Sequence, residues 1–131
     1  MWVLFFAILV GLAGPAAAQE PGQRPSTPVV LGASPDYDAC PTDGVVNGLD
    51  PAGDGFLAVR GGPGAKNQEL DRLHNGAQVS ICVWRGDWLG IVYTRTGQDC
   101  NVSTPWPVSQ AYTGPCRSGW AHRRWIREVA G

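Results

Sequence analysis

The sequence has little net charge, −1 in total, because 10 Lys and Arg residues nearly offset its 11 Asp and Glu residues. No strong basic field is present to attract nucleic acid, so we expect no nucleic-acid partner. The sequence also lacks an apolar run of the about 20 residues that a membrane-spanning helix needs, since its longest run is residues 2–13. No two of its cysteines have the C-x-x-C spacing of a zinc site, and we expect no metal and no cofactor.

The short apolar run has the features of a secretory signal peptide. It ends in Gly14 and Pro15 and is followed by alanines at residues 16–18, whose small side chains fit the specificity of signal peptidase. We predict cleavage after Ala18, which leaves a mature chain with no membrane segment. The alternative is that the run stays uncleaved as a membrane anchor.

Export places the chain in an oxidising compartment, the periplasm or the cell envelope, where disulfides form. The four cysteines are an even number and therefore predict two disulfides. The chain also contains 18 glycines and 11 prolines, and both residue types interrupt helices. This composition disfavours a helical bundle.

Two regions of the mature chain differ in composition. Residues 19–38 are rich in proline and poor in large apolar side chains, which predicts a flexible tether. Residues 39–131 form the predicted domain. Within it, apolar residues alternate with others from residue 77 to residue 84, the pattern of a strand with one buried face.

Further short strands are predicted between turns that are rich in glycine, proline and aspartate. Residues 68–73 fit either a strand or a helical turn, and Asn75 with Gly76 predicts a tight hairpin turn. Five or six short antiparallel strands joined by tight turns indicate an all-β fold, a small barrel. The other predicted strands are residues 45–49, 56–60, 88–93, 118–121 and 125–129.

Four segments of the chain resemble, in order, the motifs of the bacterial SH3 (SH3b) family. They are an L-x-V-R-x-G-P-G opening, an L-x-x-G-x-x-V hairpin, a W-x-x-V strand and a G-W-x-H ending, at residues 56–64, 73–79, 86–92 and 118–126. The resemblance implies an SH3-like barrel. It also implies a binding module whose ligand is a cell-wall peptide, a glycan or an envelope protein.

The chain departs from the family at residues 94–117, a long insert where the family has a short turn. Cys100 and Cys116 both lie in this insert, and a bridge between them closes a loop of about 16 residues, worth about 3 kcal/mol in the chain-entropy model. That pairing leaves Cys40 with Cys82, which would staple the N-terminal lead onto the outside of the barrel. Four cysteines allow three connectivities, and the other two remain open.

The end of the chain places arginines beside tryptophans. Guanidinium groups and aromatic faces bind anionic or polar polymers, so we expect a ligand site there. Flanking prolines hold one further tryptophan in the insert, where it is suited to anchor a ligand. The alternative is that the tryptophans belong to the core and the arginines form a solvated rim. The predicted ligand-binding residues are Trp106, Arg117, Trp120, Arg123, Arg124 and Trp125.

Enzyme activity is not expected. No serine has a recognisable nucleophile context, and the cysteines are expected to be oxidised, so His74 and His122 have no nucleophile to activate and are assigned packing or capping roles. The sequence predicts an exported, monomeric, non-enzymatic SH3b binding module of the bacterial cell envelope. Two alternatives are an inhibitor or regulator of an envelope hydrolase and a purely structural partner in an envelope assembly.

Overall fold

The computed structural model describes residues 11, 24–53 and 55–130 of the chain. In these residues the regular structure is nine strands and one short 3-10 helix. No helix in the described part of the chain has the length and apolar character that crossing a membrane requires. The elements are β1 (Val30–Leu31), β2 (Thr42–Val46), β3 (Leu57–Arg60), β4 (Glu69–Leu73), β5 (Gln78–Arg85), β6 (Trp88–Tyr93), β7 (Gln110–Ala111), β8 (Arg117–His122), η1 (Arg123–Trp125) and β9 (Ile126–Ala130).

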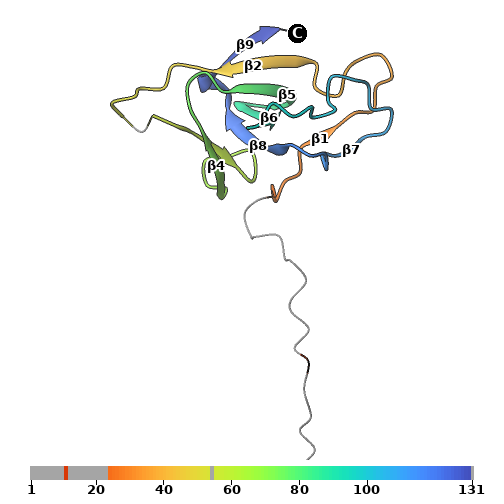
Figure 1. Ribbon diagram of the computed structural model, residues 1–131, viewed down its shortest axis with the longest axis horizontal. Helices are drawn as coiled ribbons and strands as arrows, with labels where there is room; N and C mark the ends of the chain where they lie inside the picture. Colours follow the sequence, from red (N-terminus) through yellow and green to blue (C-terminus); the bar gives the residue numbers. More distant parts are fainter. Residues whose placement is uncertain (1–10, 12–23, 54, 131) are drawn as a thin grey trace, which may run out of the picture.

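Seven strands form one antiparallel sheet in the order β4-β3-β8-β6-β5-β2-β9, and β1 pairs with β7 in a second, small sheet (Figure 1). The predicted all-β class is confirmed, but the large sheet is open, which differs from the expected barrel of five or six strands. Its outer strands β4 and β9 each pair with a single neighbour. A closed barrel would require β4 and β9 to pair with each other, and these two edge strands do not. The β3–β4 hairpin joins the rest of the sheet through one residue pair, Arg60 with Trp120.

Residues 68–73, which the sequence leaves undecided between strand and helical turn, contain β4. The β3–β4 pairing shifts register between Val59 and Arg60, so that Leu70 has no partner in β3. Such a β-bulge adds one residue to one strand. The three-residue spacing of Leu70 and Leu73 resembles that of a helical turn, but the bulge accommodates it within a strand.

Asn75 and Gly76 form a turn, but not the predicted hairpin turn. β4 pairs with β3, whereas β5 pairs with β2 and β6, so the turn connects two strands that are not paired. The side chain of Asn75 instead accepts a hydrogen bond from the Leu49 N–H at 3.0 Å and donates one to the Leu49 carbonyl at 2.9 Å. The turn residue thereby holds the loop that follows β2.

The main core lies on one face of the large sheet. Alternation along β5 places Val79 and Ile81 in this core, whereas Ser80 and Cys82 face the other side. The other buried apolar residues of the main core are Val46, Leu49, Leu57, Val59, Leu73, Leu89, Ile91, Tyr93, Ala121 and Ile126.

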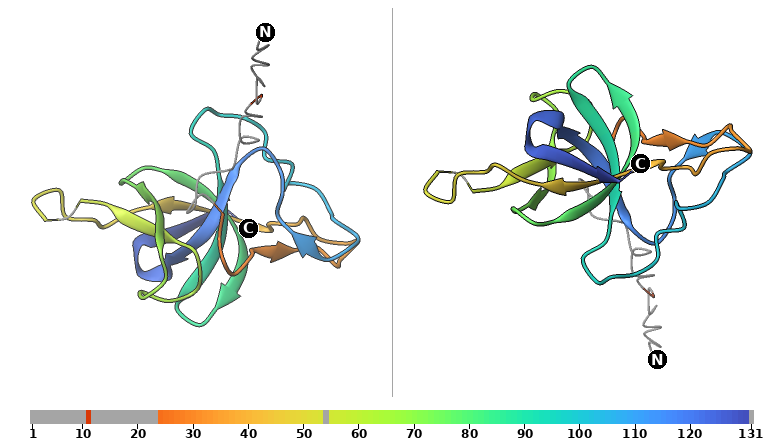
Figure 2. Two further views of the ribbon diagram at one scale, coloured as in Figure 1. Left: turned by 90° about the horizontal axis from the view of Figure 1, so that it is seen from below. Right: turned by 90° about the horizontal axis from the view of Figure 1, so that it is seen from above.

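The opposite face of the central strands is covered by two segments that are far apart in sequence, residues 24–40 and the insert at residues 94–117 (Figures 1 and 2). Backbone hydrogen bonds join the two segments: Tyr112 N–H donates to the Val29 carbonyl, and Cys40 N–H donates to the Val102 carbonyl. The insert therefore packs on the sheet. These two segments form a cover layer, whose buried side chains include Leu31, Ala39, Cys40, Val102 and Tyr112 packed with Val92 of β6.

Residues 24–38 differ from the flexible tether expected for residues 19–38. Val29 and Leu31 are buried, and the indole N–H of Trp120 donates to the Thr27 carbonyl at 2.8 Å. A proline-rich composition excludes a helix but permits an extended segment, and β7 supplies the pairing partner that β1 needs. The remaining residues of the predicted tether lie outside the described residues, as does the predicted signal peptide apart from Gly11.

Both predicted disulfides are present. Cys40–Cys82 links the cover layer to β5 across a sequence separation of 42 residues, and Cys100–Cys116 closes the insert across 16. The described residues contain no free cysteine. Two disulfides in a small domain favour an oxidising compartment outside the cytoplasm.

Candidate functional site

The six predicted ligand-binding residues do not form one site. Arg117 begins β8, whereas Arg123, Arg124 and Trp125 follow the other end of this strand in η1. A strand rises by about 3.3 Å per residue, so the six residues of β8 separate the two groups by roughly 20 Å.

Trp120 is 0% exposed and offers no surface to a ligand, which corrects the prediction that it binds one. It lies opposite Gly90 in the β6–β8 register. A Cβ atom at Gly90 would come within 3.1 Å of Val29 and 3.4 Å of the Trp120 ring. Gly90 has no side chain and therefore leaves room for Trp120 beneath the cover layer. Trp120 thus belongs to the core, which was the alternative to a role in ligand binding.

The η1 end of the molecule forms an arginine corner. Arg123 and Arg124 are exposed, and the Arg124 guanidinium lies 4.8 Å from the centroid of the half-buried Trp125 ring. His122 accepts a hydrogen bond from the Arg124 N–H at its Nδ1 atom, at 3.1 Å, so it caps η1. The capping role predicted for His122 is confirmed.

Arg117 belongs to a different cluster, which is centred on Asp71 of β4. The Asp71 carboxylate accepts hydrogen bonds from Arg95 at 2.6 Å, from the Tyr93 hydroxyl at 2.7 Å and from Arg117 at 3.3 Å. Tyr93 and Arg117 are paired residues in the β6–β8 register, and Arg95 follows β6. Three strands thus bring these four side chains together.

The charge states within this cluster follow from its contacts. Partial burial raises the pKa of Asp71, but the hydrogen bonds from Arg95 and Tyr93 outweigh burial and hold the pKa below its usual value. Burial, together with the neighbouring carboxylate, raises the pKa of the Tyr93 hydroxyl well above its usual range. At neutral pH Asp71 is therefore an anion, Tyr93 is a neutral donor, and two guanidinium groups share one carboxylate.

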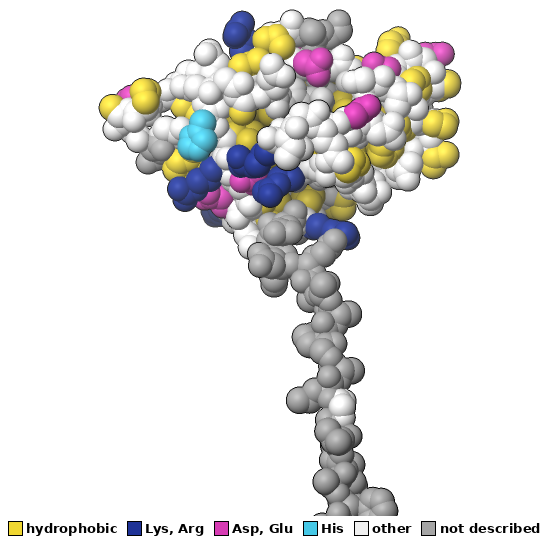
Figure 3. Space-filling view, in the orientation of Figure 1, with side chains coloured by type: hydrophobic (Ala, Val, Ile, Leu, Met, Phe, Trp, Pro, Cys, Tyr) yellow, Lys and Arg dark blue, Asp and Glu magenta, His cyan; other side chains and the backbone are white. Residues whose placement is uncertain are grey.

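Three members of the Asp71 cluster, Asp71, Tyr93 and Arg117, line a hollow of about 450 Å³ beside the cover layer, and Arg95 reaches the same carboxylate from outside this lining. Basic side chains gather around acidic ones on this face of the molecule (Figure 3). Concave surfaces with apolar walls and a few charged groups are the usual form of a ligand site. This hollow is the arginine groove, and its lining includes Arg24, Leu70, Asp71, Tyr93, Tyr112 and Arg117.

Trp106 lies in the insert, next to the arginine groove. Its ring stacks on that of Tyr112, with ring centroids 6.0 Å apart and planes 19° from parallel. Trp106 lines a second hollow of about 450 Å³, the tryptophan hollow, which also contains Asn101 and Gln110. Residues 113–115 line both hollows. The stacked rings and this short segment therefore form a wall between two adjoining hollows.

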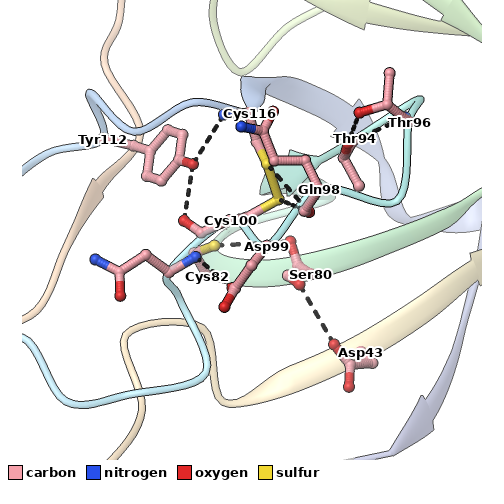
Figure 4. Close-up of a disulfide and its surroundings, with 11 residues drawn as sticks. Asp43, Ser80, Cys82, Thr94, Thr96, Gln98, Asp99, Cys100, Tyr112 and Cys116 are labelled. Atoms are coloured by element: carbon pink, nitrogen blue, oxygen red, sulfur yellow. Dashed lines mark hydrogen bonds between the residues drawn. A yellow bond between two sulfur atoms is a disulfide. The ribbon is translucent and has the colours of Figure 1, made fainter.

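The disulfide of the insert holds this wall in place. The Tyr112 hydroxyl donates to the Cys100 carbonyl at 2.9 Å and accepts from the Cys116 N–H at 3.2 Å (Figure 4). The Trp106 indole N–H donates to the Asn101 carbonyl at 2.9 Å. Burial raises the pKa of the Tyr112 hydroxyl, which keeps its proton and can bridge the two half-cystines.

A third hollow, of about 390 Å³, lies between β2, β5 and the insert. Its lining includes Asp43 and Asp99, and the Ser80 hydroxyl donates to Asp43 at 3.4 Å. The described residues contain no group of three or more His, Cys, Asp and Glu side chains placed to hold a metal ion. This hollow is acidic, and an anionic ligand would be repelled from it.

Of the predicted ligand-binding residues, Arg117 and Trp106 line hollows, whereas Asp71, Tyr93 and Arg95 were not among the predicted residues. Asp71 lies in the middle of β4, and Tyr93 and Arg95 lie at and just after the end of β6, so nothing in the sequence marks them as neighbours. The pairings of β4 with β3, of β3 with β8 and of β8 with β6 bring them together. Comparisons with known protein families, with curated proteins and with solved structures find no match to this chain.

Proposed function

We propose that this chain is an exported, non-enzymatic binding module of the SH3b type that binds an anionic polymer of the bacterial cell envelope in the arginine groove. The four SH3b-like segments support this architecture, because they fall on β3, on the β4–β5 turn, on β6 and on the β8–η1 segment. The chain is then an open variant of the SH3-like barrel in which the cover layer occupies one face of the sheet.

One observation carries the ligand chemistry: Arg95 and Arg117 converge on a single carboxylate, Asp71. One carboxylate neutralises one guanidinium, so the cluster retains an excess positive charge, and Arg24 lines the same groove. The Arg117 side chain is 57% exposed, and its remaining N–H donors are available to a second acceptor. Carboxylates and phosphates are the groups that a guanidinium binds most strongly.

The peptide stems of peptidoglycan carry carboxylates and therefore supply a ligand of this chemistry. The disulfides and the predicted signal peptide favour the compartment in which this polymer is found. The apolar walls of the groove, among them Leu70 and Tyr112, lower the local dielectric and strengthen an ion pair formed there.

Co-sedimentation of the oxidised full chain with purified peptidoglycan sacculi tests this proposal. The double variant Arg95→Gln/Arg117→Gln is expected to lower affinity about tenfold or more, since a hydrogen bond to a charged group contributes about 1.5–3 kcal/mol. Arg123→Gln/Arg124→Gln is the matched control, because it removes the same charge at the arginine corner and is expected to bind normally. Loss of binding in the control alone, or nanomolar association with an envelope hydrolase and none with sacculi, contradicts the proposal.

A further inference from the structure

The arginine groove leaves the role of Trp106 unexplained. Pro105 and Pro107 flank this tryptophan and restrict the backbone on both sides of it. Its indole N–H is already bonded to Asn101, and stacking on Tyr112 fixes the plane of the ring. The protein thus holds a half-buried aromatic ring rigidly at the wall of a hollow, with its donor group satisfied and with the ring available for contact.

The tryptophan hollow differs from the arginine groove in charge. Among the described residues that line it, none is charged, and its polar side chains are the amides of Asn101 and Gln110 and the hydroxyl of Thr113. Amides and hydroxyls both donate and accept hydrogen bonds. This lining does not select an anion, and it suits a neutral ligand with several hydroxyl or amide groups.

A pyranose ring has this chemistry. One face of the ring presents C–H groups, which are attracted to the electron-rich face of an indole, and its edge carries hydroxyl or acetamido groups. The hollow has a volume of about 450 Å³, within the range of small-molecule sites. A purely apolar ligand would leave the Asn101 and Gln110 amides without partners, which disfavours such a ligand as occupant.

The two hollows adjoin. Residues 113–115 line both of them, and the stacked rings of Trp106 and Tyr112 each line one. A polymer that enters both hollows must therefore place a neutral ring on one side of this wall and an acidic group on the other, within a short length of chain. A glycan that carries carboxylates has this arrangement.

We propose that the tryptophan hollow is a sugar subsite, in which Trp106 stacks on one neutral pyranose ring of a glycan. The acidic group next to that ring lies in the arginine groove, a part of the inference that rests on the proposed function. The insert then gives the module its specificity for a glycan over an acidic protein.

Titration calorimetry of the oxidised full chain with two defined probes tests this inference. The probes are chitotetraose, which is neutral, and a soluble disaccharide muropeptide, which carries carboxylates. Trp106→Ala is expected to weaken the binding of both probes about tenfold or more, whereas Trp106→Phe, which keeps an aromatic face, stays within about threefold. Arg117→Gln is expected to weaken only the muropeptide.

Trp84→Ala is the matched control, because Trp84 is an exposed tryptophan of β5 that lines neither hollow. Each variant is first shown by urea unfolding to be folded. Normal muropeptide binding by Trp106→Ala together with weak binding by Arg117→Gln would overturn the sugar subsite and leave the proposed function standing. The reverse pattern would overturn the arginine groove and leave the sugar subsite. Equal losses in Trp84→Ala and Trp106→Ala would overturn the assignment of the tryptophan hollow.

Discussion

Removal of each disulfide in turn distinguishes the bridge that stabilises the fold from the bridge that positions the site. Cys40–Cys82 spans 42 residues of sequence and Cys100–Cys116 spans 16. In the chain-entropy model these separations correspond to about 4 and about 3 kcal/mol of stability. Cys40 is also buried in the cover layer, so its truncation adds a cavity cost to the loss of the longer loop closure.

The order of effects on ligand binding is expected to be the reverse. Cys100 and Cys116 supply the carbonyl and the N–H that hold the Tyr112 hydroxyl, and Tyr112 supports the wall between the two hollows. Cys100→Ala/Cys116→Ala is therefore expected to lower affinity for the muropeptide about fivefold or more. Cys40→Ala/Cys82→Ala is expected to bind within about twofold of the wild-type chain while it remains folded.

Urea unfolding followed by near-UV circular dichroism gives the two free energies of unfolding, and calorimetry below the transition gives the two affinities. The expected result is a crossed pattern, in which the variant without Cys40–Cys82 is less stable and the variant without Cys100–Cys116 binds less well. If one bridge dominates both quantities, or if neither affects binding, the reasoning that Cys100–Cys116 positions the Tyr112 wall is refuted.

Three further changes test separate parts of the structure. Trp120→Phe is expected to lower the free energy of unfolding, measured in urea, by about 2–3 kcal/mol, because the ring is smaller and the hydrogen bond to the Thr27 carbonyl is lost. Ligand affinity is expected to be unchanged, and a binding defect would show that Trp120 contributes to the ligand site. Asp71→Asn is expected to cost about 1 kcal/mol at pH 7. The pKa of Asp71 is lowered in the folded state, so this contribution to stability is present above the unfolded pKa of about 3.9 and is lost as the pH falls below it. The stability curves of the variant and of the wild type are therefore expected to converge at about pH 2. A constant gap between the two curves would contradict the assignment. Asn75→Ala is expected to cost about 1–3 kcal/mol in the same urea assay, since it leaves both backbone groups of Leu49 without their partner, and an unchanged midpoint would contradict this role.

Local patterns in the sequence predicted local structure well. The alternation over residues 77–84 is found as β5 (Gln78–Arg85), and the expected strand at residues 88–93 is β6 with the same bounds. Both disulfides have the pairing that the sequence favours among the three possible connectivities, with one pair inside the insert. In each case the prediction depends only on residues that are close in the sequence, or on a choice among three cysteine pairings.

Long-range pairing was not predictable from these patterns. The proline-rich residues 24–38 do not indicate that Val30 and Leu31 pair with β7, more than seventy residues later. The Asp71 cluster likewise depends on the register that places Tyr93 beside Arg117. Both features are set by which strands become neighbours in the sheet, and a single sequence carries little information on this choice.

Backbone and indole NMR shifts of the ¹⁵N-labelled oxidised chain, measured during titration with the soluble muropeptide, test the central claim most directly. The account predicts that the largest changes occur at residues 93–95 and 112–118 and at the Trp106 indole N–H, on both sides of the wall between the hollows. Changes confined to η1 and its neighbours, residues 122–127, would contradict the account, as would the absence of any change at saturating muropeptide.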